Sequence, residues 1–167
     1  ASYYLGEDGL RVAALHLANS GATSMVSTAE DLARWLGNLG THAVGGPAVA
    51  RMMRERGTLA SGDSLDYALG VTLDEHRGVR RVQHPGSDAG FRTFIGYYPD
   101  LDAGVVALGN VASFDRQGVA DGLAELFFGD EMDARKPSGG VDDAEVVIPT
   151  ARLDAFAGRY QIPGGPV

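Results

Sequence analysis

Residues 67–109 read YALGVTLDEHRGVRRVQHPGSDAGFRTFIGYYPDLDAGVVALG and carry the clearest pattern in the chain. Short runs of alternating apolar and small or polar residues are separated by glycine, proline and aspartate, as in β-strands joined by tight turns. We expect residues 85–90 to be a loop, and strands at 67–74, 79–84, 91–98 and 103–109. Because parallel neighbours need long crossovers, connections this short predict an antiparallel meander.

Two helices are expected before the meander. Ser27-Thr28-Ala29-Glu30 has the spacing of a capping box, in which the serine oxygen accepts from the amide of Glu30 and the glutamate side chain reaches back. The apolar positions that follow at helical spacing are Leu32, Trp35, Leu36 and Leu39. Gly40 is the expected stop, and Pro47 suits the first turn of a second helix that ends near Arg56. Its inward positions are Val49, Met52 and Met53.

A third helix is expected after the meander. Asp115 can cap its first turn, and Gly129 follows its last. Its apolar positions at helical spacing are Val119, Leu123, Leu126 and Phe127. The order of helix, helix, four-strand meander and helix predicts an α+β protein, with an antiparallel β-meander flanked by helices.

The composition excludes several classes of protein. The 167 residues carry 14 Lys+Arg against 22 Asp+Glu, a net charge of −8, which the phosphate backbone of a nucleic acid would repel. No apolar run approaches the ~18 residues of a spanning helix, so no membrane span is expected. With no cysteine, the chain has no disulfide framework, thiolate nucleophile or cysteine-ligated zinc site. Localisation stays open.

The character of the chain changes near its end. Residues 131–150 are acidic and contain proline and glycine next to Lys136, which predicts a linker. Residues 151–167 hold a short apolar segment before a proline- and glycine-rich end. Residues 1–130 are therefore expected to form the main unit. Because the chain begins at Ala1 without an initiator methionine or a signal segment, we expect a processed or excised start.

No metal or cofactor site is expected. No two histidines stand three or four residues apart, so isolated loop or surface positions are the simpler interpretation of His16, His42, His76 and His84. The glycines at Gly86 and Gly90 precede a predicted strand, whereas a phosphate-binding loop leads into a helix. The nucleophile pattern Gly-x-Ser-x-Gly is also absent from the sequence.

The stretch His84-Pro85-Gly86-Ser87 combines reactive residues with a position at the end of a predicted strand. Pro85 holds His84 extended, and Gly86 lets a ligand come close to the backbone. The amide of Ser87 can then donate to an oxyanion. The alternative interpretation is a glycine-rich hairpin with a solvent-exposed histidine.

Five segments in this order resemble the back half of the serine β-lactamase-like hydrolases, which include class C β-lactamases, DD-peptidases, D-aminopeptidases and related esterases. These segments are Ser27–Trp35, Tyr67–Val71, His84–Phe91, Tyr98–Asp100 and Val105–Asn110. The resemblance spans residues 2–130 and implies the C-terminal part of a β-lactamase/transpeptidase-like fold. It also implies that residues 151–167 begin a small lipocalin-like β-barrel, with a disordered chain end as the alternative.

The family uses three motifs, and the third, Lys-Thr-Gly or His-x-Gly, matches His84 and Gly86. The resemblance implies that His84 helps to hold the substrate carboxylate or hydrogen-bonds the catalytic network. It implies that the Ser87 amide supplies half of the oxyanion hole. Pro85 departs from the family, in which a small or hydroxyl residue often occupies that position.

The other two motifs, Ser-x-x-Lys and Tyr-x-Asn or Ser-x-Asn, are not found. The sole lysine is Lys136, with Asp133 three residues before it, and no tyrosine has an asparagine two residues later. Acyl transfer needs an activated hydroxyl within reach of a base, so we expect the isolated chain to be inactive. The parent protein should be a serine hydrolase of amide, ester or β-lactam bonds. A non-catalytic member that binds a ligand or peptide is the alternative, and a stand-alone interaction module is a further one.

The resemblance also implies partners, beginning with a small-molecule or peptide substrate. In the family, an N-terminal half of the same catalytic domain completes the sheet beside the strand that matches residues 103–109. Without it that edge is open and apolar, at Val105, Val106 and Leu108, and open edges recruit partners. We therefore expect self-association through this edge or exchange of the C-terminal helix.

Overall fold

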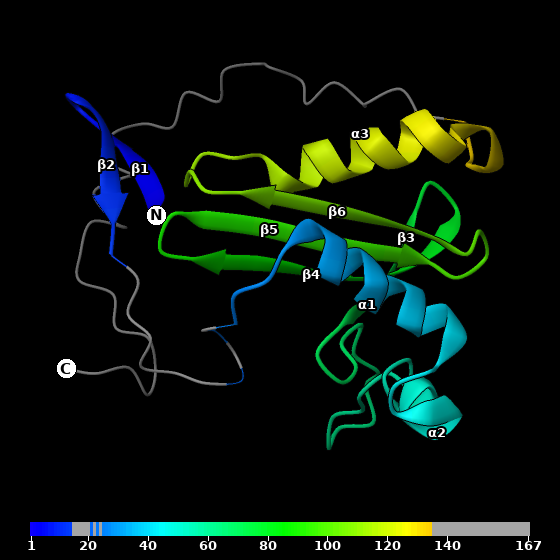
Figure 1. The fold of residues 1–167 in the computed structure, drawn as a ribbon. Helices are drawn as coiled ribbons and strands as arrows, with labels where there is room; N and C mark the ends of the chain where they lie inside the picture. The colour runs from blue at the N-terminus through cyan, green and yellow to red at the C-terminus, as the bar shows by residue number, and fades with distance from the viewer. Residues whose placement is uncertain (15–20, 22, 24, 135–167) are drawn as a thin grey trace, which may run out of the picture. The chain divides into compact units, whose positions relative to one another are not determined.

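The structure is a computed structural model that describes residues 1–14, 21, 23 and 25–134 (Figure 1). The chain divides into two units, residues 1–134 and 135–167, and the described fold belongs to the first. The predicted linker from residue 135 onward and the predicted barrel strand lie outside the described residues.

A four-stranded antiparallel sheet is the centre of this unit. Its strands, in spatial and chain order, are β3 (Thr72–His76), β4 (Val79–Asp88), β5 (Phe91–Tyr98) and β6 (Ala103–Gly109). Each strand pairs with the next (Figure 1), which confirms the predicted meander. In the register, Val82 lies opposite Tyr97, and Ile95 lies opposite Val106.

β4 is longer than predicted. It continues to Asp88, so the predicted loop at residues 85–90 shrinks to a turn in which Ala89 has a φ of 47°. β3 pairs with β4 only as far as Gln83, so beyond that residue no described strand pairs with β4 on its β3 side. Proline lacks an amide hydrogen to donate, and an edge without a partner tolerates it, which explains how Pro85 lies within a strand.

β3 is shorter than predicted. It begins at Thr72 instead of Tyr67, because Gly70 has a φ of 74°, a left-handed conformation that interrupts an extended strand. Tyr67 keeps one isolated bridge, to Thr72. Residues 67–71 therefore form a loop that returns beside the start of β3.

Helices flank the sheet, and they are α1 (Ala29–Thr41), α2 (Gly46–Met52), α3 (Arg116–Phe128) and the 3-10 turn η1 (Gly129–Glu131). α1 is capped by Thr28, whose hydroxyl accepts from the Asp31 amide at 3.2 Å, one residue later than the predicted Ser27 cap. α3 is capped by Asp115, as predicted, through the Gly118 amide at 2.9 Å.

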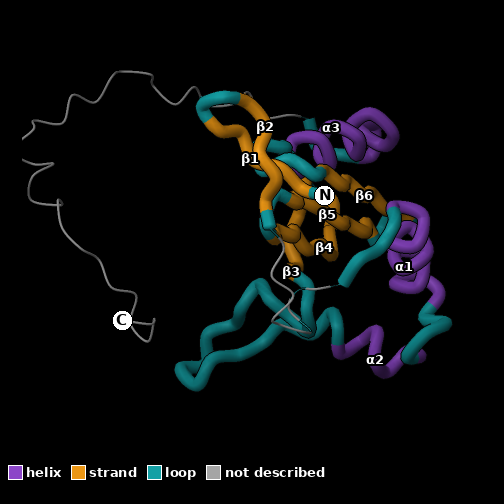
Figure 2. The backbone as a smooth tube through the Cα atoms, turned by 60° about the vertical axis from the view of Figure 1, so that its left-hand side comes forward, coloured by secondary structure: helices purple, strands orange, loops and turns teal. Residues whose placement is uncertain are grey.

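α1 and α3 lie on opposite faces of the sheet (Figure 2). On the α1 face, Leu36 and Leu39 pack into a buried cluster with Val82 and Tyr97, which confirms part of the predicted apolar stripe. Trp35, predicted in the same stripe, is exposed. A helix resting on a sheet buries only the residues that point straight at it, so the margin of a stripe stays in solvent.

The buried side of α3 differs from the prediction. Its fully buried residues are Ala120 and Ala124, whereas Leu126 and Phe127 are 76% and 77% exposed. Alanine lets the helix backbone approach the sheet closely, so the larger side chains are displaced to the flank. Leu123 packs against a buried cluster beneath α3, which consists of Val79, Tyr98, Val105, Ala124 and Met132. The other residues of the predicted stripe, Val119, Leu126 and Phe127, are exposed.

α2 is also shorter than predicted and buries another residue. It ends at Met52, before the predicted end near Arg56, and its buried residue is Ala50. Val49 and Met52, predicted to point inward, are exposed, and Met53 is partly buried against the α1 cluster.

An N-terminal hairpin was not predicted. β1 (Ser2–Gly6) pairs with β2 (Gly9–Ala13), and the hairpin contacts the sheet where β5 begins and β6 ends (Figure 1). Tyr3 exchanges backbone hydrogen bonds of 2.8 Å with Asn110 and Ala112, and the buried Ser2 hydroxyl accepts from the Gly90 amide at 3.1 Å. The hairpin therefore supports the turn that follows β4.

Candidate active site

The alternation of β4 places His84 and Gly86 on one face of the sheet and Ser87 on the other. His84 and Gly86 share the face of Val82, which packs against α1. Ser87 shares the face of Arg81, on which α3 lies. Beyond Gln83 this part of β4 pairs only with β5, among the described residues. A free strand edge of this kind offers backbone groups to an extended ligand.

His84 is half-buried and touches Tyr67. The Tyr67 hydroxyl lies 3.1 Å from Nε2 of His84, and the two rings pack edge to face. Tyr67 comes from the loop before β3, where its carbonyl accepts from the Gly57 amide at 2.9 Å. The alternating pattern predicted a strand at Tyr67 and carried no signal for this contact, because the loop geometry at Gly70 creates it.

Gly86 leaves room for the side chain of Thr93 on the neighbouring strand. Thr93 lies opposite Gly86, and a Cβ added to Gly86 would lie 2.2 Å from its Oγ1. Real Cβ atoms do not approach this closely, so the glycine is required by packing as well as by any ligand. The threonine hydroxyl therefore lies directly over the backbone of Gly86.

The side chain of Ser87 points away from His84. Its hydroxyl accepts from Nη1 of Arg116, at the start of α3, at 2.9 Å. The predicted role of Ser87 concerns its backbone amide, which follows Gly86 in the part of β4 that β3 leaves unpaired. The role of the Ser87 amide stays a prediction. The Ser87 hydroxyl is hydrogen-bonded to Arg116 of α3.

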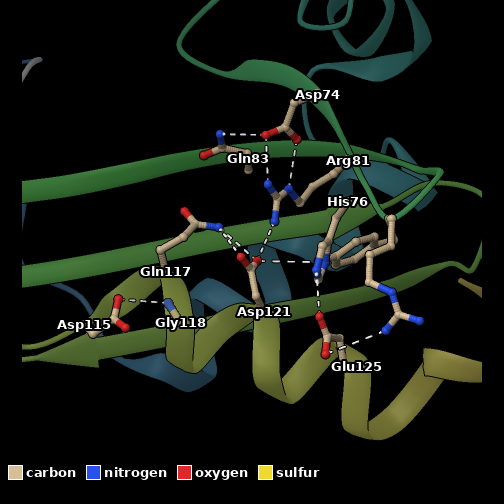
Figure 3. Close-up of polar contacts among 11 residues, drawn as sticks. Asp74, His76, Arg81, Gln83, Asp115, Gln117, Gly118, Asp121 and Glu125 are labelled. Carbon is tan, nitrogen blue, oxygen red and sulfur yellow. Dashed lines mark hydrogen bonds and ion pairs between the residues drawn. The ribbon is translucent and has the colours of Figure 1, made fainter. Parts of the chain in front are cut away.

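A partly buried charged network lies beneath α3 (Figure 3). It shares the sheet face of Arg81, which alternation along β4 places opposite His84. Arg81 donates to both carboxylate oxygens of Asp74, at 2.9 and 2.8 Å, and to Asp121 at 2.7 Å. Gln83 and Gln117 donate to the same two carboxylates. Burial alone would lower the pKa of Arg81, but the hydrogen bonds and charge of Asp74 hold it above its ordinary value. Arg81 is therefore a permanent cation that joins β3, β4 and α3.

His76 extends this network and corrects the prediction that it lies in a loop or on the surface. It is the last residue of β3 and is buried, with Nδ1 2.9 Å from the Tyr98 hydroxyl. Its Nε2 lies 3.5 Å from Glu125 and its Nδ1 lies 3.8 Å from Asp121, both on α3. The network holds the helix to the back of the candidate site and takes no part in its open face.

The comparisons with known proteins agree with this arrangement. A family model described as Beta-lactamase matches residues 1–128. The chain belongs to the beta-lactamase family. The resemblance drawn from the five sequence segments is thereby confirmed, and the chain is a member of a serine hydrolase family. A search of curated proteins finds no match.

Among solved structures, this beta-lactamase-family chain is similar to the octameric penicillin-binding protein homologue from Pyrococcus abyssi, with a TM-score of 0.66 and 21% sequence identity. The match covers 77% of this chain and 30% of that chain, so the present sequence spans under a third of the homologue. At this identity the likeness shows the fold, which confirms the predicted β-lactamase/transpeptidase-like class. No helix in the described part of the chain is long and apolar enough to cross a membrane.

Proposed function

We propose that this chain supplies the third-motif strand of a serine hydrolase that cleaves amide, ester or β-lactam bonds through an acyl-enzyme. The observation that carries the proposal is the placement of His84 and Gly86 on one face of β4, where β3 no longer pairs with the strand. The family match over residues 1–128 supports a serine hydrolase reaction. Residues 1–130 would then be the C-terminal part of a larger catalytic domain.

Each residue of the motif has a role that follows from its chemistry. The His84 ring would hydrogen-bond the substrate carboxylate or the catalytic hydroxyl network. The Ser87 amide would be one of the donors to the oxyanion that forms when a serine attacks the carbonyl. The absence of a side chain at Gly86 makes room for the Thr93 hydroxyl, which would lie beside the substrate on this face.

The nucleophile and its base would come from an N-terminal half of the same domain. This sequence has no Ser-x-x-Lys and no Tyr-x-Asn, so the proposed chemistry needs residues from outside it. The fraction of the penicillin-binding protein homologue that the match leaves uncovered is large enough to hold such a half.

Acyl-enzyme formation tests this function. The chain extended upstream through its reading frame should gain the mass of an acyl group when incubated with a β-lactam or a p-nitrophenyl ester, measured by intact mass spectrometry. The 167-residue chain alone should gain none and should hydrolyse nitrocefin no faster than its His84→Ala variant. An upstream sequence without Ser-x-x-Lys, or acylation of the short chain, would contradict the proposal.

The same proposal assigns a partner to one side of the molecule. The outer edge of β6 has no strand beside residues 103–109 in the described part of the chain, and the strand contains neither charge nor proline. Val119 and Leu126 are exposed on the side of α3 turned away from Asp121, and therefore toward this edge. An N-terminal half of the domain would cover both features, and in its absence a second copy would.

A further inference from the structure

Tyr67 and His84 form a side-chain pair that joins the loop before β3 to β4. The Tyr67 hydroxyl lies 3.1 Å from Nε2 of His84, and the ring centroids are 5.9 Å apart at an interplanar angle of 69°. The edge-to-face contact sets the plane of the imidazole, and the hydrogen bond sets which nitrogen points at the phenol. Together they restrict both the position and the rotation of the His84 ring.

The backbone that carries Tyr67 is itself fixed. Its carbonyl accepts from the Gly57 amide at 2.9 Å, and the Gly57 carbonyl accepts from the Leu65 amide at 2.8 Å. On the other side, the Leu73 amide donates to the Asp66 carbonyl at 2.7 Å. Tyr67 is therefore presented to His84 from a loop whose two arms are hydrogen-bonded, although nearly half of its surface is exposed.

The two imidazole nitrogens of His84 have different surroundings. Nε2 faces the Tyr67 hydroxyl, and no group in residues 1–14 or 25–134 hydrogen-bonds Nδ1. Neutral imidazole has one donor and one acceptor nitrogen, and the cation has two donors. A tyrosine hydroxyl both donates and accepts, so Tyr67 can partner Nε2 in each of these states.

We propose that Tyr67 is a positioning residue for His84. The Tyr67 hydroxyl occupies Nε2, which leaves Nδ1 as the nitrogen that meets the substrate or the catalytic hydroxyl network. What Nδ1 meets rests on the proposed function, but the assignment of the nitrogens is a property of this chain. Nδ1 is the ring nitrogen nearer the backbone. Its partner must therefore approach close to β4, on the face that carries His84 and the Thr93 hydroxyl.

The site of alkylation tests this assignment. Iodoacetate carboxymethylates a histidine nitrogen with loss of iodide, and Nε2 is the less hindered nitrogen of an unpartnered histidine. In the 167-residue chain, the His84 peptide should carry mainly the Nδ1 product. Tyr67→Phe, which keeps the ring and removes the hydroxyl, should raise the Nε2 share by about two- to tenfold, the range that one net hydrogen bond supplies. Mainly Nε2 product in the unchanged protein would overturn the proposal.

Nitrogen-15 NMR gives a second readout that needs no reagent. Tyr67→Phe should shift the Nε2 resonance of His84, because that nitrogen loses its hydrogen-bond partner, and should move the Nδ1 resonance less. Tyr4→Phe, an exposed tyrosine on β1, is the matched control and should leave both resonances unchanged. Equal spectra for the two variants would overturn the proposal. Neither experiment depends on catalysis. If the hydrolase assignment fails, these results would still stand, and if these results fail, the hydrolase assignment would still stand.

Discussion

At the scale of single residues, the two faces of β4 have different roles. His84 and Gly86 face the open side, while Arg81 and Gln83 are tied to carboxylates beneath α3. The buried cation and its partners hold the strand against the helix. The positions on the His84 face can therefore be small or exposed without loss of the strand.

Gly86→Ala should destabilise the fold through a single contact. The new Cβ would meet Oγ1 of Thr93, and we expect a loss of about 1–3 kcal/mol in the free energy of unfolding. Removing the hydroxyl in Gly86→Ala/Thr93→Ala should recover part of that loss, as measured by urea denaturation. Gly37→Ala, on the exposed side of α1 where an added Cβ meets nothing within 4 Å, is the control and should stabilise the protein by about 0.5–1 kcal/mol. Equal effects at Gly86 and Gly37 would refute this account.

Alkaline pH should weaken the fold through Tyr98. Burial raises the pKa of Tyr98, and the Arg81 charge offsets part of that rise. The unfolded chain releases this proton near pH 10 while the folded chain retains it, so stability is complete below about pH 10 and falls above it. Burial and Asp102 raise the pKa of Tyr97 in the same direction.

Tyr98→Phe removes one of these two groups. We expect the variant to start from lower stability, by about 1 kcal/mol for the lost contact with His76, but to lose stability less steeply above pH 10. Urea midpoints between about pH 8 and pH 11 measure the slope. An unchanged slope would show that Tyr98 does not couple folding to pH.

At the scale of elements, hydrophobic spacing predicted where helices and strands lie but not which side they bury. The meander and the Asp115 cap follow from local chemistry, because turns and caps are made by neighbouring residues. The burial of Ala120 in place of Leu126 depends on how closely α3 approaches the sheet, which no local pattern records. The burial of His76 and the contact of Tyr67 with His84 likewise depend on residues far away in the sequence.

The uncovered side of β6 and α3 should make the 167-residue chain self-associate. Sedimentation velocity should show a coefficient that rises with protein concentration. Leu126→Glu, at an exposed position on that side, should weaken association by about tenfold or more, because it removes about 1.5–3 kcal/mol of apolar burial. Val44→Glu, at a residue that is also mostly exposed but lies between α1 and α2, is the control. A strictly monomeric profile at all concentrations would contradict the prediction.

At the scale of the whole molecule, the described unit supports β4 from one face of the sheet. The other face, which carries His84, is left partly open. α3 and the charged network hold the back of the sheet, α1 covers part of the front, and the N-terminal hairpin supports the turn after β4. His84, Gly86 and Ser87 could be named as candidates from the sequence because motif spacing is local, and their roles stay a prediction. The charged network on the opposite face joins β3, β4 and α3, which are distant in the sequence. It could therefore not be predicted before the fold was known.

The most direct test of the central claim is kcat/KM for nitrocefin or p-nitrophenyl acetate in the upstream-extended protein, with and without His84→Ala. If His84 acts in acyl transfer, the variant should lose about 10²–10⁴-fold, the range for a group that acts in the transition state, while Ser87→Ala, which keeps the backbone amide, should lose at most a few-fold. Full activity of His84→Ala, in a protein whose urea midpoint matches the parent, would contradict the account.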